Sequence, residues 1–211
     1  MTLRVIAWNV GPRKRLVGSV REIIADRDPE VLALFEATRF TLRLRLRFAR
    51  RYRVIRRRSD VVVLVKRTLP KPKVVVLWHN AAWVGPKAGI QHRGRKHLDL
   101  TIGEDRLRLV HRVPGGPSGG ILTRGANRLA WVVEEHLLRR AWWEGPRVAC
   151  IGDQNAHIGE MVDYVTELGA ELIITGGKVD WGYQRGHKRA RGFLLGHYGS
   201  DHRAVAYRLE S

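Results

Sequence analysis

The chain has 211 residues, and its 39 lysines and arginines against 20 aspartates and glutamates give a formal net charge of +19. A hydrophobic content of 44% supports one compact domain with a large core, and no apolar run approaches the length of a membrane span. The single cysteine, Cys150, excludes an intrachain disulfide. We expect one domain over residues 1–211, monomeric and cytoplasmic, since the N-terminus enters a strand without a signal peptide.

The charge favours a polyanionic partner. Nucleic acid is the first candidate, and anionic lipid headgroups are the second. The alternative is an arginine-rich source composition with no binding role.

The N-terminal third alternates strands and helices. Residues 3–9 predict a strand that ends in Asn9, and residues 16–26 carry apolar side chains at helical spacing. Residues 31–35 predict a second strand, followed directly by Glu36.

Residues 41–47 are compatible with two structures. Strict alternation of leucine with arginine is a strand pattern, whereas both residue types are good helix formers. We favour the helix.

The middle of the chain is rich in β-branched residues, which are typical of strands. Strands are expected over residues 52–55, 60–66, 74–78, 96–102 and 106–110, the last two as a hairpin around residues 103–105. Residues 113–120 predict an irregular loop. The longest helix is expected over residues 127–142, with a buried face formed by Leu129, Val132, Val133, His136, Leu137 and Ala141.

In the last third, residues 147–151 predict a short buried strand that ends at Gly152. A helix over residues 160–168, a strand over 171–174 and a closing strand over 201–209 follow. Many strands with few helices between them indicate two packed sheets flanked by helices.

Two polar side chains, Asp153 and Asn155, follow the strand over residues 147–151. On an extended backbone, residues i and i+2 point to the same side. A carboxylate there can deprotonate a water, and a carboxamide can donate to a developing charge on a phosphate. The alternative is an Asx turn after a strand.

Four motifs occur in order along nearly the whole chain: Trp8-Asn9, Glu36 after the second strand, Gly-Asp-Gln-Asn at 152–155, and Ser-Asp-His at 200–202. Together they resemble the endonuclease/exonuclease/phosphatase superfamily, whose members include deoxyribonuclease I, abasic-site endonucleases, sphingomyelinases and inositol polyphosphate phosphatases. The resemblance implies a four-layer α/β sandwich, in which helices flank two mixed β-sheets and the active site lies where strand ends converge.

The resemblance implies a metal site at Glu36, with Asn9 helping to hold the ion and Asp201 near it. Oxygen ligands and a phosphate substrate indicate Mg²⁺ or Mn²⁺. Many members have glutamine where this chain has Phe35, so we expect altered support of the metal ligand.

By the same resemblance, His202 contacts the scissile phosphate or the attacking water. Asp180 then hydrogen-bonds His202 and sets its tautomer. His111 falls where deoxyribonuclease-like members carry a phosphate-contacting histidine; the alternative is a core or rim histidine.

Basic clusters at predicted loops are candidates for phosphate-backbone contacts. They comprise Arg93, Arg95, Arg185, Lys188, Arg189, Arg191 and the run 56–58. The alternative for each is a solvated face.

The sequence thus predicts a Mg²⁺-dependent phosphodiesterase, a nuclease acting on DNA rather than RNA. The competing hypotheses are a phosphatase or phosphodiesterase of lipid or inositol phosphates, and a catalytically inactive nucleic-acid-binding module.

Overall fold

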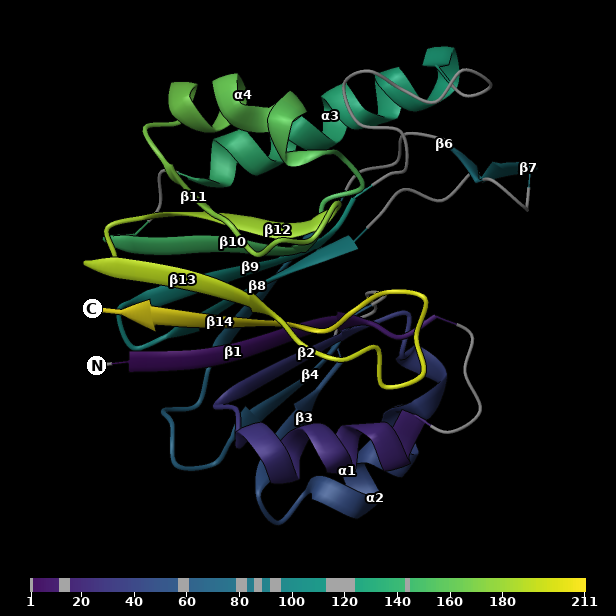
Figure 1. Ribbon diagram of the computed structural model, residues 1–211, viewed down its shortest axis with the longest axis vertical. Helices are drawn as coiled ribbons and strands as arrows, with labels where there is room; N and C mark the ends of the chain where they lie inside the picture. The colour runs from purple at the N-terminus through teal and green to yellow at the C-terminus, as the bar shows by residue number, and fades with distance from the viewer. Residues whose placement is uncertain are drawn as a thin grey trace.

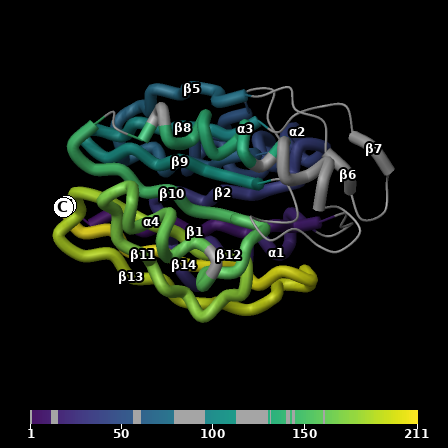
Figure 2. Tube along the Cα trace, turned by 90° about the horizontal axis from the view of Figure 1, so that it is seen from above, coloured from purple at the N-terminus to yellow at the C-terminus, as the bar shows by residue number. Residues whose placement is uncertain are grey.

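Two six-stranded sheets pack against each other, and helices cover the outer face of each (Figure 1; Figure 2 is the view from above). The computed structural model describes residues 2–11, 16–56, 61–78, 83–85, 89–91, 96–112, 124–142 and 145–211. The four-layer α/β sandwich expected from the sequence is confirmed.

The first sheet has the strand order β13-β14-β1-β2-β4-β3. Its strands are β1 (Thr2–Asn9), β2 (Val31–Phe35), β3 (Tyr52–Ile55), β4 (Val61–Lys66), β13 (Arg189–Leu194) and β14 (Val205–Glu210). Only β1 and β2 pair in parallel within this sheet. Helices α1 (Leu16–Arg27) and α2 (Thr41–Phe48) cover its outer face, with the 3-10 turn η1 (Thr38–Phe40) before α2 (Figure 1).

The second sheet has the order β11-β12-β10-β9-β8-β5. Its strands are β5 (Lys73–Trp78), β8 (Lys96–Ile102), β9 (Asp105–His111), β10 (Arg147–Asp153), β11 (Glu171–Ile173) and β12 (Asp180–Arg185). Its outer helices are α3 (Arg124–Trp142) and α4 (Val162–Glu167), with the 3-10 turn η2 (Ile158–Met161) before α4. Two short strands, β6 (Trp83–Gly85) and β7 (Gly89–Gln91), pair separately.

The core between the sheets follows from the two-residue period of the strands. Leu3 and Val5 of β1 point inward, as do Leu107 and Leu109 of β9, and all four are 0–1% exposed. Each such side chain contributes about 1.5–3 kcal/mol by leaving water. Both sheets therefore share one continuous apolar layer.

The ambiguous segment 41–47 is helical, as we favoured. Leu44 and Phe48 of α2 are buried one turn apart, while Leu42 and Leu46 are 68% and 79% exposed. The alternating sequence thus places alternate leucines on opposite sides of a helix.

The predicted buried face of α3 is wrong at Val132, Val133 and His136. Leu137 does pack against the core, and the side chains of Leu129 and Ala141 lie outside the described part of the chain. Val132 and Val133 are 51% and 38% exposed and His136 is exposed, whereas the buried positions are Ala130, Glu134, Leu138 and Trp142. The acidic Glu134 lies on the inner face. The prediction missed this face because it assigned the buried side from apolar residues.

Three expectations near the C-terminus also need correction. The loop predicted over residues 185–191 is shorter and covers only residues 186–188, because β12 continues to Arg185 and β13 starts at Arg189. The closing strand begins at Val205, and residues 201–204 precede it. Strand β10 runs through Gly152 to Asp153. The expected loop at 113–120 lies outside the described residues, and no described helix is long and apolar enough to cross a membrane.

Candidate active site

Strand ends from both sheets meet at one end of the sandwich. Parallel pairing of β1 with β2 sets Asn9 beside the residue before Glu36, and parallel pairing of β9 with β10 sets His111 beside Asp153. Strand β12 begins at Asp180, directly opposite Asp153. The sheets are joined here, because Asn9 Nδ2 donates to Asp153 Oδ2 at 3.1 Å. The fold therefore brings these predicted site residues together.

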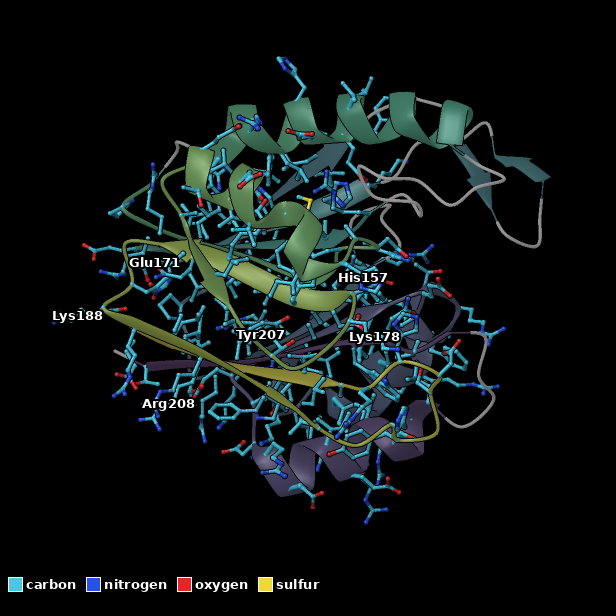
Figure 3. The ribbon with its side chains drawn as sticks, turned by 45° about the horizontal axis from the view of Figure 1, so that its top comes forward. His157, Glu171, Lys178, Lys188, Tyr207 and Arg208 are labelled. Carbon is cyan, nitrogen blue, oxygen red and sulfur yellow. The ribbon has the colours of Figure 1, made fainter. Side chains whose placement is uncertain are left out.

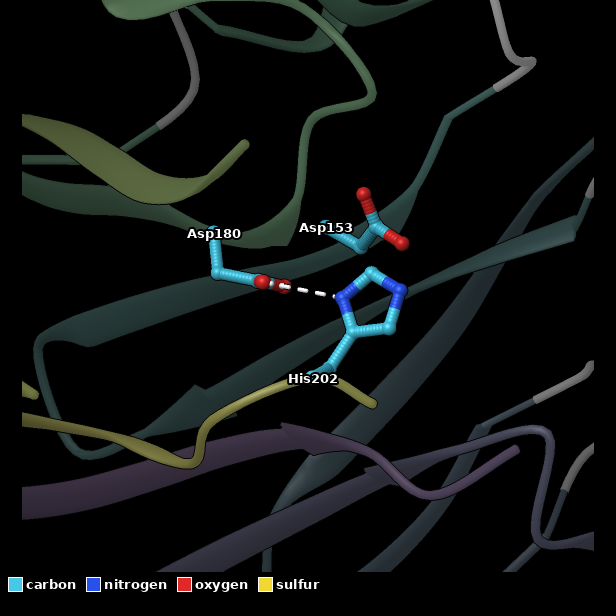
Figure 4. A group of neighbouring side chains, drawn as sticks. All are labelled: Asp153, Asp180 and His202. Carbon is cyan, nitrogen blue, oxygen red and sulfur yellow. Dashed lines mark hydrogen bonds and ion pairs between the residues drawn. The ribbon is translucent and has the colours of Figure 1, made fainter. Parts of the chain in front are cut away.

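The segment before β14 adds His202 to this cluster. His202 Nδ1 lies 2.9 Å from Asp180 Oδ2 (Figure 4), and Trp8 Nε1 donates to the His202 carbonyl at 3.3 Å. The hydrogen bond to Asp180 outweighs burial and raises the pKa of His202 to about 9. The imidazole is therefore protonated at neutral pH.

Asp153 is 1% exposed. Burial is the main cause that raises its pKa to about 7, and the nearby charge of Asp180 adds to it. The charge of His202 and the hydrogen bond from Asn9 oppose this shift. The result is a carboxylate that can exchange a proton near neutral pH, which is the property of a general base.

The turn after β10 is an Asx turn, the alternative to an extended segment given above. Asn155 has φ +48° and its backbone N–H donates to Asp153 Oδ1 at 3.0 Å, so residues 153–155 form an Asx turn rather than an extended segment. The prediction that both side chains project from one extended backbone is wrong. Asn155 Nδ2 instead donates to the carbonyl of Arg112 at 2.8 Å, which ties the turn to the end of β9.

Gly152 allows this turn to lie close to its neighbours. It has φ +134°, and a Cβ there would lie 2.2 Å from the Val110 carbonyl oxygen and 2.7 Å from the Phe35 ring. The Phe35 ring also packs edge-on to His111, with ring centroids 6.0 Å apart. The aromatic residue before Glu36 therefore contributes packing under the site.

Two carboxylates face the buried imidazole of His111. Its Nε2 lies 3.5 Å from Glu36 Oε1 and 3.7 Å from Asp153 Oδ2, and the Glu36 side chain is 41% exposed. Asn9 Oδ1 accepts the Gly11 N–H at 3.2 Å and has a second lone pair. These oxygen donors, with Glu36 open to solvent, fit Mg²⁺ or Mn²⁺.

A second set of potential metal ligands is Asp153, Asp180 and His202, whose donor atoms lie within 4.8 Å of one another. His202 Nδ1 is engaged by Asp180 and the ring is protonated at neutral pH. Nδ1 of His202 and both oxygens of Asp153 already make hydrogen bonds, which suits proton transfer. Glu36 offers the metal a more open carboxylate.

Asp201 lies at the rim and is exposed. The Ser200 hydroxyl is 2.7 Å from the Asn9 carbonyl oxygen and 3.2 Å from Asp201 Oδ1, so Asp201 is connected to the end of β1. Burial raises the pKa of Asp201, but backbone N–H groups, the Ser200 hydroxyl and the His202 charge together lower it. Asp201 is therefore ionised at neutral pH.

Comparisons of the whole chain with known proteins bear on its fold. Neither a family model nor a curated protein matches the sequence. Solved structures do match. TDP2 of D. rerio complexed with a single-strand DNA product is 16% identical over 100% of this chain and 99% of that chain, with a TM-score of 0.65. The 3′ phosphatase NExo from Neisseria, bound to a product DNA hairpin, is 14% identical over 99% of this chain and 100% of that chain, with a TM-score of 0.66.

Beta toxin from Staphylococcus aureus is 13% identical over 97% of this chain and 99% of that chain, with a TM-score of 0.67. The chain has the deoxyribonuclease I-like fold of the endonuclease/exonuclease/phosphatase superfamily. The resemblance stated from the four sequence motifs is thus confirmed at the level of this fold.

Behind the candidate active site lies a buried charged layer that the sequence did not predict. Glu134 of α3 contacts His97 Nε2 at 2.9 Å and Arg112 Nε at 3.3 Å, and all three are 0% exposed. The His111 backbone N–H lies 3.4 Å from His97 Nδ1. The carbonyl oxygen of Arg112 also accepts from Asn155 Nδ2. Glu134 therefore contacts the two residues that support His111 and Asn155. No sequence signal singled it out, because one glutamate within a helix usually faces solvent.

The basic candidates are placed differently. Arg185 Nη2 lies 3.4 Å and 3.3 Å from the carbonyl oxygens of Trp142 and Gly145. Its guanidinium therefore makes hydrogen bonds to the backbone of this chain. The turn at Lys188 lies at the opposite end of the sandwich from Lys178, which is close to Asp180 in sequence (Figure 3). Arg189 and Arg191 follow on β13. Arg93, Arg95 and residues 57–58 lie outside the described residues.

Proposed function

We propose that this chain is a Mg²⁺- or Mn²⁺-dependent phosphodiesterase whose substrate is DNA. The observation that carries the proposal is the cluster of Asp153, Asp180 and His202, which combines a buried base and a protonated imidazole at the strand ends. The proposal includes a single monomeric, cytoplasmic domain over residues 1–211.

Asp153 would act as the base. It accepts a proton from a water molecule, and the hydrogen bonds from Asn9 Nδ2 and the Asn155 N–H fix the orientation of its carboxylate. Burial supports this role, because it raises the proton affinity of the carboxylate to a value suited to neutral pH.

His202 would stabilise the negative charge that develops on the phosphate. Asp180 holds Nδ1, and the second ring nitrogen points away from Asp180 (Figure 4), so it is available to donate to a phosphate oxygen. We also assign to the phosphate His111 and the second Nδ2 hydrogen of Asn155, whose first hydrogen is donated to the Arg112 carbonyl.

Glu36, Asn9 and Asp201 would hold the divalent ion. When bound, the ion supplies positive charge that offsets the phosphate and the leaving oxygen. Glu36→Gln keeps the side-chain shape and removes the charge, so we expect a higher Mg²⁺ concentration for half-maximal activity. Glu22→Gln, an exposed position on α1, is the matched control, and identical titrations for both variants would remove Glu36 from the metal site.

A cavity of about 500 Å³ lies beside the cluster and supports a phosphate-rich substrate. Its lining includes the carboxylates of Asp180 and Asp201 together with His202 and two basic residues, Lys178 and Arg203. Arg203 Nε donates to the Leu195 carbonyl at 2.8 Å, which holds its guanidinium at the cavity. With a net charge of +19 and the DNA-bound structures of the same fold, this cavity favours DNA.

The second candidate is a phosphodiesterase of lipid phosphates. It is favoured by the two exposed leucines of α2, Leu42 and Leu46, which stand among the exposed arginines Arg43, Arg45 and Arg47. An apolar pair flanked by cations suits an anionic lipid surface.

The test is incubation of the protein with supercoiled plasmid, linear DNA, RNA, an abasic duplex and sphingomyelin or inositol phosphate vesicles. Each is run with Mg²⁺, with Mn²⁺ and with EDTA. We expect metal-dependent DNA cleavage that Asp153→Asn slows by about two to four orders of magnitude. Release of phosphate products from the vesicles alone would favour the second candidate, and DNA binding without any cleavage would leave a binding module.

A further inference from the structure

Three arginines lie in one row across the outer face of the first sheet. Strand register places Arg191 of β13 opposite Arg208 of β14, and Arg208 opposite Arg4 of β1. All three are exposed. Directly opposed residues in antiparallel pairs have Cβ atoms about 4.5–5.5 Å apart. This arginine row therefore concentrates three positive charges in a narrow band.

Internal ion pairs neutralise only part of the arginine row. Arg4 Nη2 lies 2.7 Å from Glu30, and Arg208 Nε lies 3.1 Å from Glu210. Among the described residues, Arg191 has no carboxylate within ion-pair distance. Like charges directly opposite each other destabilise a sheet. Within the fold, the ion pairs of Arg4 with Glu30 and Asp28 and of Arg208 with Glu210 oppose this repulsion.

An exposed aromatic ring stands next to the arginine row. Phe193 follows Arg191 by two residues on the same face of β13 and is 50% exposed. The Phe193 side chain borders a hollow of about 160 Å³, whose lining includes Arg4 and Arg208 of the arginine row. The lining also includes Arg27, Pro29, Ile6, Val5, Ala206 and Tyr207. The hollow thus has a mainly apolar wall and a cationic rim.

Protection of a sheet edge does not explain this surface. Charged residues on the edge strand β13 discourage edge-to-edge pairing, which accounts for Arg189 and Arg191. It does not account for Arg208 and Arg4 on inner strands, and an exposed phenylalanine on an edge strand works against such protection.

We propose that this face, formed by the arginine row and Phe193, is a second binding site that takes single-stranded nucleic acid. An unstacked base would pack on the Phe193 ring beside the hollow, and the backbone phosphates would lie along the arginines. A duplex hides the faces of its bases, so it cannot use the ring. An anionic membrane is favoured less, because the face offers one aromatic side chain rather than an apolar stripe.

The face is distinct from the candidate active site. Arg208 and Lys188 lie at the end of the sandwich away from Lys178 and His157 (Figure 3), and the arginine row lies on the outer face of its sheet. The inference therefore does not rest on the proposed cleavage chemistry.

The test measures binding of a fluorescent oligothymidine to the full chain by anisotropy, in EDTA. Phe193→Leu keeps an apolar side chain and removes the ring, so it should weaken binding about 5- to 150-fold, the loss of one stacked base. Arg191→Gln should lower the slope of log K against log salt by about 0.7, the value for one phosphate of a single strand. Leu46→Ala and Arg43→Gln on α2 are the matched controls, and they should bind like the wild type.

A second measurement does not depend on binding. Arg191→Gln removes one of the opposed like charges, so without nucleic acid it should raise Tm by about 0.5–4 °C. Oligothymidine should then raise the Tm of the wild type more than that of this variant.

The proposal is overturned if Phe193→Leu binds with wild-type affinity, or if Arg191→Gln and Arg43→Gln give the same salt slope. It is also overturned if the Phe193 and Arg191 variants lose binding to phosphatidylglycerol vesicles but keep binding to oligothymidine. Binding is measured in EDTA and requires no cleavage, so a failure of the proposed cleavage leaves this result unaffected.

Discussion

At the scale of single residues, Asp153 is a carboxylate held at 1% exposure beside a second carboxylate, Asp180. Its pKa of about 7 in the fold lies above the ordinary 3.8 of an unfolded chain. Between these values the unfolded chain releases a proton that the folded chain keeps, so the fold loses stability as the pH rises toward 7. A group needed for chemistry is thus held at a cost to stability.

Asp153→Asn removes that ionisation. In EDTA, the Tm of the variant should exceed that of the wild type above pH 7, and the difference should shrink as the pH falls toward 4. Cleavage by the same variant should fall by about two to four orders of magnitude. The measurements are thermal unfolding across pH and single-turnover cleavage; a Tm difference that is constant with pH would contradict the buried, proton-exchanging carboxylate.

The rate of the wild type should have a bell-shaped pH dependence. It rises as Asp153 loses its proton, at or below pH 7 because a bound cation lowers that pKa, and it falls as His202 loses its proton near pH 9. Asp180→Asn removes the main cause of the raised His202 pKa, so the alkaline limb should move to lower pH. An alkaline limb unchanged in this variant would remove Asp180 from that role.

At the scale of elements, α3 contributes a carboxylate where a helix normally buries apolar side chains. Glu134 lies between His97 of β8 and Arg112 after β9, and these two contact the backbone or side chain of His111 and Asn155. The helix is thus coupled to the site through charge as well as packing.

Glu134→Gln removes the negative charge from this layer. We expect a loss of about 3–5 kcal/mol of unfolding free energy, because the buried guanidinium of Arg112 loses its counter-charge. Below the unfolding transition, kcat should fall more than KM rises, since the turn at Asn155 loses its support. Urea unfolding and steady-state kinetics check both. Glu135→Gln, which affects a surface pair with Arg139 on the same helix, should cost less than about 1 kcal/mol.

At the scale of the whole molecule, the core between the sheets contains residues from both of them. The hydrogen bond between Asn9 and Asp153 also crosses from one sheet to the other. Unfolding of either sheet would expose the apolar inner face of the other. This arrangement supports one cooperative unit over residues 1–211.

We therefore expect a single unfolding transition in urea. Far-UV circular dichroism and tryptophan fluorescence should give the same midpoint, since Trp8 belongs to the first sheet while Trp142 and Trp181 pack on the second. Two different midpoints, one for the unfolding of each sheet, would show that the chain contains two units.

The sequence by itself determined most strands and the order of the motifs that carry the site. Strands β2, β3 and β8 have the predicted bounds, because runs of apolar, β-branched residues report burial locally. Asn9, Glu36, Asp153 and His202 are candidate site residues because of their places in the four motifs. That signal is local in sequence, and so it survives without knowledge of the pairing.

Tertiary structure alone decided the support of the site and the placement of the basic residues. Glu134 and Arg112 are buried because they satisfy each other across elements, and such pairing is invisible to a pattern that assigns charge to the surface. Strand register decided that Arg191, Arg208 and Arg4 form one row, because their positions in the chain are far apart. Antiparallel pairing of β12 with β10 decided that Asp180 lies at Asp153 while Arg185 lies at the other end. These are non-local pairings, and no periodicity along the chain encodes them.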